Sequence, residues 1–190
     1  MTQIAIFASG AGSNAKKIIE FFEQKKNNAA KVSLIVCNKP GAGVLKIAEQ
    51  HNIPTILLDK EKFFNGNGYL DELEAAGINL IVLAGFLWKI PVDLVKAYHK
   101  KMINIHPALL PKYGGKGMYG RFVHEAVLAN KEKESGITIH YVDDIYDNGQ
   151  IILQATCVID KNETPETLAA KVQLLEHRHF PAAVALLSTL

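Results

Sequence analysis

The sequence lacks the features that mark several large classes of protein. It has only two cysteines, Cys37 and Cys157, which lie far apart, show no metal-ligand spacing and stand in apolar runs. We therefore expect two buried thiols in a reducing compartment, the cytoplasm, and neither a disulfide framework nor a metal site. The first apolar run is too short to span a membrane and no basic segment precedes it, so we interpret it as a strand rather than a signal peptide.

Strong charge of either sign is also absent. The chain of 190 residues has 21 lysines and arginines against 19 acidic residues, a formal net charge of +2, and its basic residues are scattered. Because nucleic-acid surfaces need clustered basic side chains, we expect neither a nucleic-acid partner nor a membrane partner. The length and a hydrophobic share of 48% fit one globular domain over 1–190. A homodimer is compatible with this composition.

Short apolar runs alternate with amphipathic segments through the N-terminal half. This alternation predicts strands that are buried on both faces and helices that cover the sheet, which is a Rossmann-like, mostly parallel α/β fold with right-handed crossovers. The expected strands are 4–8, 32–37, 54–58, 79–85 and 102–106. The expected helices are 15–26, 44–51, 69–76 and 91–98.

The pattern changes after the fifth expected strand. Residues 107–120 are rich in Gly, Pro and Tyr, and loops of this length are usually functional. The short polar link between the last two extended stretches predicts antiparallel C-terminal additions to the sheet. The expected elements are a helix at 121–130, strands at 136–142 and 150–159, and a final helix with Thr164 as N-cap and Pro165 at its first position.

A glycine-rich loop at 9–15 joins the first strand to the first helix. Backbone amides at a helix N-terminus carry partial positive charge, and glycines let an anion approach them. The amides of Gly12, Ser13 and Asn14 are therefore candidates for binding a phosphate. A tight turn that only caps the helix would show the same pattern.

The same loop also fits the dinucleotide fingerprint G-x-G-x-x-A, which makes an NAD(P)-dependent oxidoreductase an alternative. Such a cofactor needs an acidic residue at the end of the second strand, to bind the ribose. The sequence has Cys37, Asn38 and Lys39 at that place. The missing acid weakens the alternative, and Lys39 keeps it open because a lysine can meet a 2′-phosphate.

Two polar residues, Asn104 and His106, interrupt the end of an apolar strand. Alternation along a strand puts them on one face, at the carboxyl edge where open α/β sheets bind ligands. A side-chain amide and a protonated imidazole suit the stabilisation of an oxyanion, although a hydrogen-bonded structural histidine is the alternative. A carboxylate nearby would accept a proton and favour the charged imidazole. Asp143, Asp144 and Asp147 are the candidates, and the pattern does not choose among them.

These motifs together resemble those of the glycinamide ribonucleotide (GAR) formyltransferases of purine synthesis. The matching segments are ASGAGSN at 8–14, VLAGFLWKIP at 82–91, INIHPALLPKYGG at 103–115, SGITIHYVDDIYDNGQIILQ at 135–154 and VQLLEHRHFP at 172–181. N-I-H-P-x-L-L-P followed by D-x-G is typical of folate-dependent formyltransferases and hydrolases, and S-G-x-G-S-N indicates the GAR branch.

The resemblance implies 10-formyltetrahydrofolate as the formyl donor, GAR as the acceptor and no metal. It implies that Asn104, His106 and Asp147 are catalytic and that Glu176 binds the acceptor's sugar. It puts phosphate binding in about 1–100, on Gly12, Ser13 and Asn14, and folate binding and catalysis in about 101–190. The folate-pocket positions that match the family are Phe86, Leu87, Trp88, Lys89, Ile90, Val142, Asp143 and Asp144.

Two features depart from the family pattern. Where the family often has an arginine after the third strand, this chain has only Lys60 and Lys62, and its loop at 113–120 is longer. Lys116 is a candidate for the missing charge, although such lysines are more often solvated. A 10-formyltetrahydrofolate hydrolase remains an alternative that would not need the phosphate loop. Methionyl-tRNA formyltransferases usually carry a further C-terminal RNA-binding domain, which we do not expect here.

Overall fold

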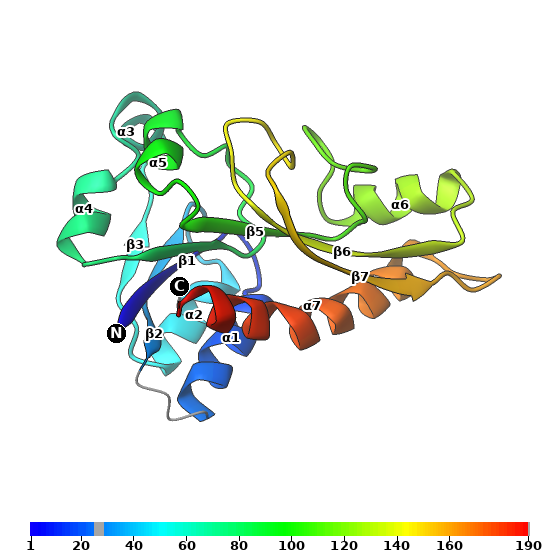
Figure 1. Cartoon of the computed structure of the whole chain (residues 1–190), viewed down its shortest axis with the longest axis horizontal. Helices are drawn as coiled ribbons and strands as arrows, with labels where there is room; N and C mark the ends of the chain where they lie inside the picture. The colour runs from blue at the N-terminus through cyan, green and yellow to red at the C-terminus, as the bar shows by residue number, and fades with distance from the viewer. Residues whose placement is uncertain (25–28, 190) are drawn as a thin grey trace.

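The computed structural model describes residues 1–24 and 29–189, and a seven-stranded sheet runs through them (Figure 1). The strand order is β3-β2-β1-β4-β5-β6-β7. The first five strands in that order pair in parallel, whereas β6 and β7 are antiparallel additions, as predicted. The strands are β1 (Thr2–Ala8), β2 (Ala30–Cys37), β3 (Thr55–Leu57), β4 (Leu80–Leu83), β5 (Met102–His106), β6 (Glu134–Tyr141) and β7 (Ile151–Val158).

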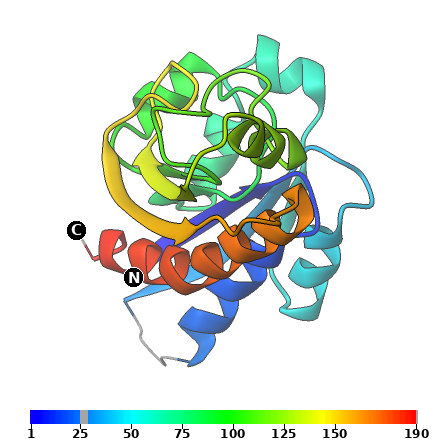
Figure 2. The same ribbon diagram turned by 90° about the vertical axis from the view of Figure 1, so that its right-hand side faces the viewer.

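Helices cover both faces of the sheet (Figures 1 and 2). On one face lie α1 (Ser13–Gln24), α2 (Gly43–Gln50) and α7 (Pro165–Leu187), and α6 (Arg121–Ala129) joins their apolar core. On the other face lie α3 (Lys60–Asn65), α4 (Leu70–Ala75) and α5 (Val92–Ala97). Figure 2 shows α7 running alongside α1, and this contact brings the C-terminal helix beside the glycine loop.

Strand β1 shows why continuous apolar runs fit this architecture. Its side chains alternate between faces, so that Ile4 and Ile6 enter the core under α1 and α7. Ala5 and Phe7 enter the core under α3, α4 and α5. All four side chains are fully buried, which confirms that the strand is covered on both sides.

Several element boundaries differ from the sequence-based expectation. Helix α3 was not expected; it begins after Asp59, whose carboxylate accepts a hydrogen bond from the amide of Lys62 at 2.8 Å. Strand β4 ends at Leu83, earlier than predicted, because the chain turns at Gly85 with φ of 73°. The predicted end of the first helix, at Lys26, lies outside the described residues.

The final helix begins as predicted. The hydroxyl of Thr164 accepts from the amide of Thr167, the hydroxyl of Thr167 accepts from the amide of Thr164, and Pro165 occupies the first turn. Of the two free thiols, Cys37 is buried as expected, but Cys157 on the edge strand β7 is only partly buried. Among helices of the described ranges, none has both the length and the apolar character needed to cross a membrane.

Candidate active site

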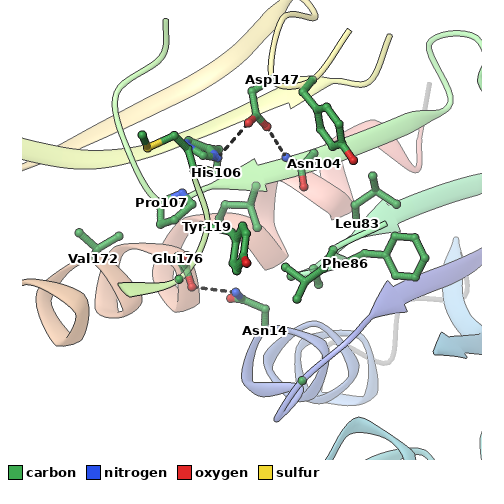
Figure 3. Close-up of a pocket in the computed structure, with 18 of the residues that line it drawn as sticks. Asn14, Leu83, Phe86, Asn104, His106, Pro107, Tyr119, Asp147, Val172 and Glu176 are labelled. Carbon is green, nitrogen blue, oxygen red and sulfur yellow. Dashed lines mark hydrogen bonds and ion pairs between the residues drawn. The ribbon is translucent and has the colours of Figure 1, made fainter. Parts of the chain in front are cut away.

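A cavity of about 770 Å³ opens where the strands β1, β4 and β5 end (Figure 3). Parallel strands end at the same edge, and for that reason three loops that are distant in sequence line one space. Its walls are formed by Gly10–Asn14, Leu83–Ile90, Asn104–Pro107, Gly115–Arg121, parts of 140–147 and one side of α7.

The glycine loop is held in shape by close packing. Gly12 has φ of 81°, and a Cβ there would lie 2.8 Å from Cα of Val44 and 2.9 Å from Cδ1 of Ile47. Only glycine fits such a backbone at such a distance. The carbonyl of Gly12 accepts from the amide of Lys16 at 2.9 Å and so begins α1. The N-terminus of this twelve-residue helix therefore faces the cavity with its unpaired first-turn amides, an arrangement that favours an anion.

Helix α7 contributes polar groups beside this loop. The amide of Asn14 donates to Oε2 of Glu176 at 2.8 Å, and the amide of Gln173 donates to the hydroxyl of Ser13 at 3.2 Å. Burial raises the pKa of Glu176, and the hydrogen bond from Asn14 offsets part of that rise. Within the described residues Oδ1 of Asn14 is buried without a partner. Acceptors placed in this way suit a ligand that brings hydroxyl donors, such as a sugar.

The segment after β4 forms a second wall. The hydroxyl of Ser9 accepts from the amide of Leu87 at 2.9 Å, which ties this wall to the glycine loop. The rings of Phe86 and Trp88 pack against Phe63 of α3, with centroids 5.9 and 5.6 Å apart. All five predicted folate residues from Phe86 to Ile90 line the cavity. Helix α3, which was not expected from the sequence, packs behind this segment through Phe63.

Asn104 and His106 point to one side of β5, and both meet Asp147 (Figure 3). The distance from Nδ2 of Asn104 to Oδ1 of Asp147 is 3.4 Å, and the distance from Nδ1 of His106 to Oδ2 of Asp147 is 3.5 Å. Both contacts are longer than an ordinary hydrogen bond, so each leaves a donor or acceptor available to a ligand. The fold thus brings together the three side chains that the family resemblance nominated for catalysis.

The three candidate aspartates occupy different positions. Asp147 sits at φ of 53° with its side chain only 11% exposed. Asp143 lines the cavity but uses its carboxylate to hold the loop, accepting from the amide of Ile145 and from the side chain of Asn148. Asp144 is not among the residues that line the cavity, unlike Val142. Geometry therefore favours Asp147 as the carboxylate that faces Asn104 and His106.

A second histidine, His140 on β6, completes this cluster and was not singled out from the sequence. Its Nδ1 lies 2.8 Å from the carbonyl of Tyr141, which can only accept, so the ring proton is on Nδ1. In the neutral ring Nε2 is then an acceptor, and the side-chain amide of Asn104 donates to it at 3.1 Å, whereas a protonated ring directs Nε2–H to Oδ1 of Asp147, 3.7 Å away. The antiparallel register of β5 and β6 pairs Asn104 with His140, a neighbour that only strand pairing reveals.

The long loop after β5 contacts the same side chains. Nε2 of His106 donates to the carbonyl of Tyr113 at 2.7 Å, and the amide of Gly115 donates to Oδ2 of Asp147 at 2.9 Å. The start of this loop is fixed by buried Thr138, whose hydroxyl donates to the carbonyl of Ala108 at 2.7 Å. The loop is thus part of the site rather than a surface connection.

Burial affects the pKa values of both His106 and Asp147. It lowers the pKa of His106, and the attraction of Asp147 and the bond to the Tyr113 carbonyl offset only part of this effect. Burial acts to raise the pKa of Asp147, but His140, His106 and the amide of Gly115 outweigh it and hold that pKa below its ordinary value. Burial thus favours the neutral imidazole at His106, against the charged form expected from the sequence, and the neighbouring groups favour the carboxylate form of Asp147.

Other residues of the cavity carried no local signal in the sequence. His124 on α6 is 4% exposed, lines the cavity, and has Nδ1 buried without a partner among the described residues. Burial, followed by the nearby His106, lowers its pKa. Tyr119 of the long loop also lines the cavity, and so does Lys116, which was already a candidate from the sequence for the missing charge. No group of three or more His, Cys, Asp or Glu in the described part of the chain is arranged to hold a metal ion.

Comparison with known proteins finds relatives over nearly the whole chain. The sequence pattern of the formyl transferase family matches residues 2–184. The chain is 41% identical over 187 residues to the chloroplastic phosphoribosylglycinamide formyltransferase of Arabidopsis thaliana, covering 96% of this chain and 64% of that protein. It is 36% identical over 188 residues to the phosphoribosylglycinamide formyltransferase of Bacillus subtilis (strain 168), covering 97% of this chain and 93% of that protein.

A solved structure shares the fold over nearly the whole chain. The crystal structure of phosphoribosylglycinamide formyltransferase from Bacillus halodurans superimposes with a TM-score of 0.86 at 35% identity, covering 98% of this chain and 94% of that chain. The chain spans slightly under two thirds of the length of the Arabidopsis relative, at 64%. None of the relatives named here is an oxidoreductase or a hydrolase.

Proposed function

The chain belongs to the formyl transferase family, and from that premise we propose that it transfers a formyl group from 10-formyltetrahydrofolate to the amine of GAR in purine biosynthesis. One observation carries the proposal. A single cavity joins a helix N-terminus suited to a phosphate with a cluster of Asn104, His106 and Asp147 suited to acyl transfer. The cytoplasmic location and the homodimer stay predictions.

The acceptor binds at the glycine-loop end. Its phosphate meets the first-turn amides of α1 at Gly12, Ser13 and Asn14, where the helix dipole favours a negative charge. Its ribose hydroxyls donate to the partly buried carboxylate of Glu176 and to Oδ1 of Asn14, which has no partner among the described residues. The glycinamide amine then extends along the cavity toward β5.

The donor binds against the segment after β4. Phe86 and its neighbours through Ile90 form one wall of its site, and Val142 and Asp143 form the other. Backbone groups in these two segments read the polar edge of the pteridine, and the apolar side chains exclude water from the formyl group. This arrangement brings the formyl carbon near Asn104 and His106.

The reaction forms one C–N bond and breaks another. The amine nitrogen attacks the formyl carbon, and the electron pair of the C=O bond moves to the oxygen. The side-chain amide of Asn104 has two hydrogens. One is held by His140, and the other makes only a long contact to Asp147 in the absence of substrate. This second hydrogen is donated to the oxyanion. Collapse of the tetrahedral intermediate then breaks the bond from carbon to N10 of the folate.

Proton transfer uses the His106–Asp147 pair. The attacking nitrogen becomes an ammonium, and Asp147 takes its proton directly or through a water. Since Nε2 of His106 already donates to Tyr113, Nδ1 is the nitrogen that accepts this proton and faces Asp147. The imidazolium formed in this way assists Asn104 at the oxyanion and then protonates N10 as it leaves. A neutral resting His106 suits this role because it begins as an acceptor.

The proposal is tested with purified protein, 10-formyltetrahydrofolate and GAR. Formylated GAR, identified by mass spectrometry, is expected in amounts that match the tetrahydrofolate formed, and neither product is expected when either substrate is omitted. Loss of donor at the same rate without GAR would instead identify a hydrolase. Absence of both reactions would reject formyl transfer altogether.

A further inference from the structure

The cavity has an uneven distribution of charge. Its acidic residues are Asp143, Asp147, Glu166 and Glu176, and its basic residues are Lys89, Lys116 and Arg121. Arg121 is neutralised, because it pairs with Glu125 and with Glu166. Over residues 1–24 and 29–189, neither Lys89 nor Lys116 makes an ion pair. A phosphate dianion that enters this cavity thus finds two uncompensated cations.

The loop that carries Lys116 crosses the cavity between two anchors. On one side the amide of Gly115 donates to Asp147 at 2.9 Å. On the other side Arg121 pairs with Glu166 at 2.7 Å, in the first turn of α7. Helix α7 is also the element that contacts Ser13 and Asn14. The loop therefore runs from the catalytic cluster to the start of α7, the helix whose later turns contact the glycine loop.

Figure 3 shows how far the loop tip reaches. The ring of Tyr119, three residues after Lys116, lies below the contacts among Asn104, His106 and Asp147 and extends toward Asn14 and Glu176. The segment thus already projects into the acceptor end of the cavity. Lys116 lines the same cavity and is exposed on this tip, where its flexible ammonium group can reach a ligand.

A glycine stands on either side of Lys116. Gly115 and Gly117 have φ of 92° and 90°, and a Cβ at either position would meet nothing within 4 Å. Glycine is therefore favoured at these two positions by the backbone conformation and not by a lack of space for a side chain. Lys89 differs, because it stands between Trp88 and Ile90, which pack against the core of α3, α4 and α5 on the donor side. Of the two lysines that make no ion pair in the described residues, Lys116 is the one flanked by glycines that no packing contact requires.

We propose that Lys116 binds the phosphate of the acceptor substrate, from the side of the cavity opposite the glycine-loop amides. The amides supply oriented hydrogen-bond donors, and Lys116 supplies the full positive charge that they lack. The inference rests on the proposed function for the identity of the acceptor. The claim that Lys116 binds the phosphate of a ligand in this cavity can be tested without the formyl transfer reaction.

The kinetic experiment compares GAR with its dephosphorylated counterpart, glycinamide riboside. In Lys116→Ala, KM for GAR is expected to rise about tenfold, the usual order for loss of a charge-assisted hydrogen bond, whereas kcat/KM for the riboside stays unchanged. Lys116→Arg is expected to restore most of the affinity for GAR. The matched control is Lys112→Ala, on the same loop but outside the cavity, where Lys112 pairs with Glu132 at 2.9 Å.

Three kinetic outcomes overturn the proposal. An equal loss with both substrates would show that Lys116 only shapes the loop. An unchanged KM for GAR would show that the ammonium group is solvated. If affinity for GAR but not for the riboside fell in Lys89→Ala and not in Lys116→Ala, the phosphate-binding cation would be Lys89.

A binding experiment separates this inference from the proposed function. Isothermal titration of ribose 5-phosphate, with ribose as the reference, needs neither folate nor turnover. About tenfold weaker binding of ribose 5-phosphate in Lys116→Ala supports the cation site even if the protein fails to formylate GAR. Equal binding by wild type and variant, or no phosphate-dependent binding by the wild type, refutes it whether or not formyl transfer is observed.

Discussion

The two ends of the cavity are built in different ways. The glycine-loop end is made of backbone, which close contacts between Gly12 and α2 hold in one conformation. The catalytic end is made of side chains from β5, β6 and two loops, which meet through the longer contacts of Asp147 to Asn104 and His106. Packing thus fixes the backbone conformation of the glycine-loop end. At the catalytic end, polar contacts and burial set the orientations and the pKa values of the side chains.

This difference teaches where each kind of substitution should act. The backbone amides of the glycine loop leave no room for an added atom at Gly12, and the amides themselves have no proton to gain or lose. A side-chain site keeps its shape after many substitutions, yet each one changes a donor, an acceptor or a pKa. Binding and stability should therefore be sensitive at the first end, and turnover and pH dependence at the second.

The largest expected effect is at the catalytic end. His106→Ala should lower kcat by about 10²-fold or more, the usual loss when a group that stabilises the transition state is removed. KM for GAR should change little, since the glycine-loop end is untouched. Steady-state kinetics measures both parameters. A fall in kcat below about threefold would remove His106 from the mechanism.

At the other end, Gly12→Ala should act on stability and binding. The alanine must adopt φ of 81° with its Cβ 2.8 Å from Val44, so we expect unfolding to become easier by about 2 kcal/mol. KM for GAR should rise about tenfold, with a smaller effect on kcat. The control is Gly10→Ala in the same loop, where an added Cβ meets nothing within 4 Å. Equal effects of the two substitutions would contradict a packed glycine loop.

A smaller effect on turnover is expected at His140. His140→Phe removes the acceptor that orients the Asn104 amide, and kcat should fall about fivefold, the order of one neutral hydrogen bond. Affinity for GAR should be unchanged. His140→Gln, which keeps a hydrogen-bonding side chain, should recover part of the rate. If both variants matched the wild type, Asn104 would not depend on His140.

The smallest expected effect is a difference in acid sensitivity. Burial lowers the pKa of His124, so below the ordinary histidine value near 6.5 the unfolded chain takes up this proton more readily than the folded protein. His124 thus contributes stability above that pH which is lost as the pH falls. Wild type should lose more stability than His124→Leu between about pH 7 and about pH 5.5, by urea unfolding. Parallel losses would show that His124 does not titrate differently on folding.

Glu176 gives the matching test with the opposite sign. Its pKa is raised by burial, so its contribution to stability is present at low pH and is lost as the pH rises through the folded value. Relative to Glu176→Gln, the wild type should become less stable on going up in pH from about 4.5. An opposite trend would mean that the Asn14 hydrogen bond outweighs burial.

Local patterns in the sequence predicted much of the site. The order of strands and helices, the helix start at Thr164, the glycine loop, and the shared face of Asn104 and His106 all follow from short-range rules. Helix α3 escaped prediction because it is six residues long and has no repeated apolar face. His140 escaped because its importance depends on which strand lies beside it.

Two features of the site depend on the tertiary structure. The pairing of Asn14 with Glu176 spans 162 residues, and the choice of Asp147 over Asp143 depends on how one loop turns against β5. The direction of the His106 pKa also depends on the tertiary structure, since burial lowers this pKa by more than the neighbouring carboxylate raises it.

The sequence by itself determined which groups stand at the carboxyl edge of the sheet, because alternation along a strand and amide exposure at a helix start are properties of neighbouring residues. Only the tertiary structure decided which of those groups touch and which carry charge. Contact across a sheet depends on strand register, and a pKa depends on how much water the surrounding chain excludes.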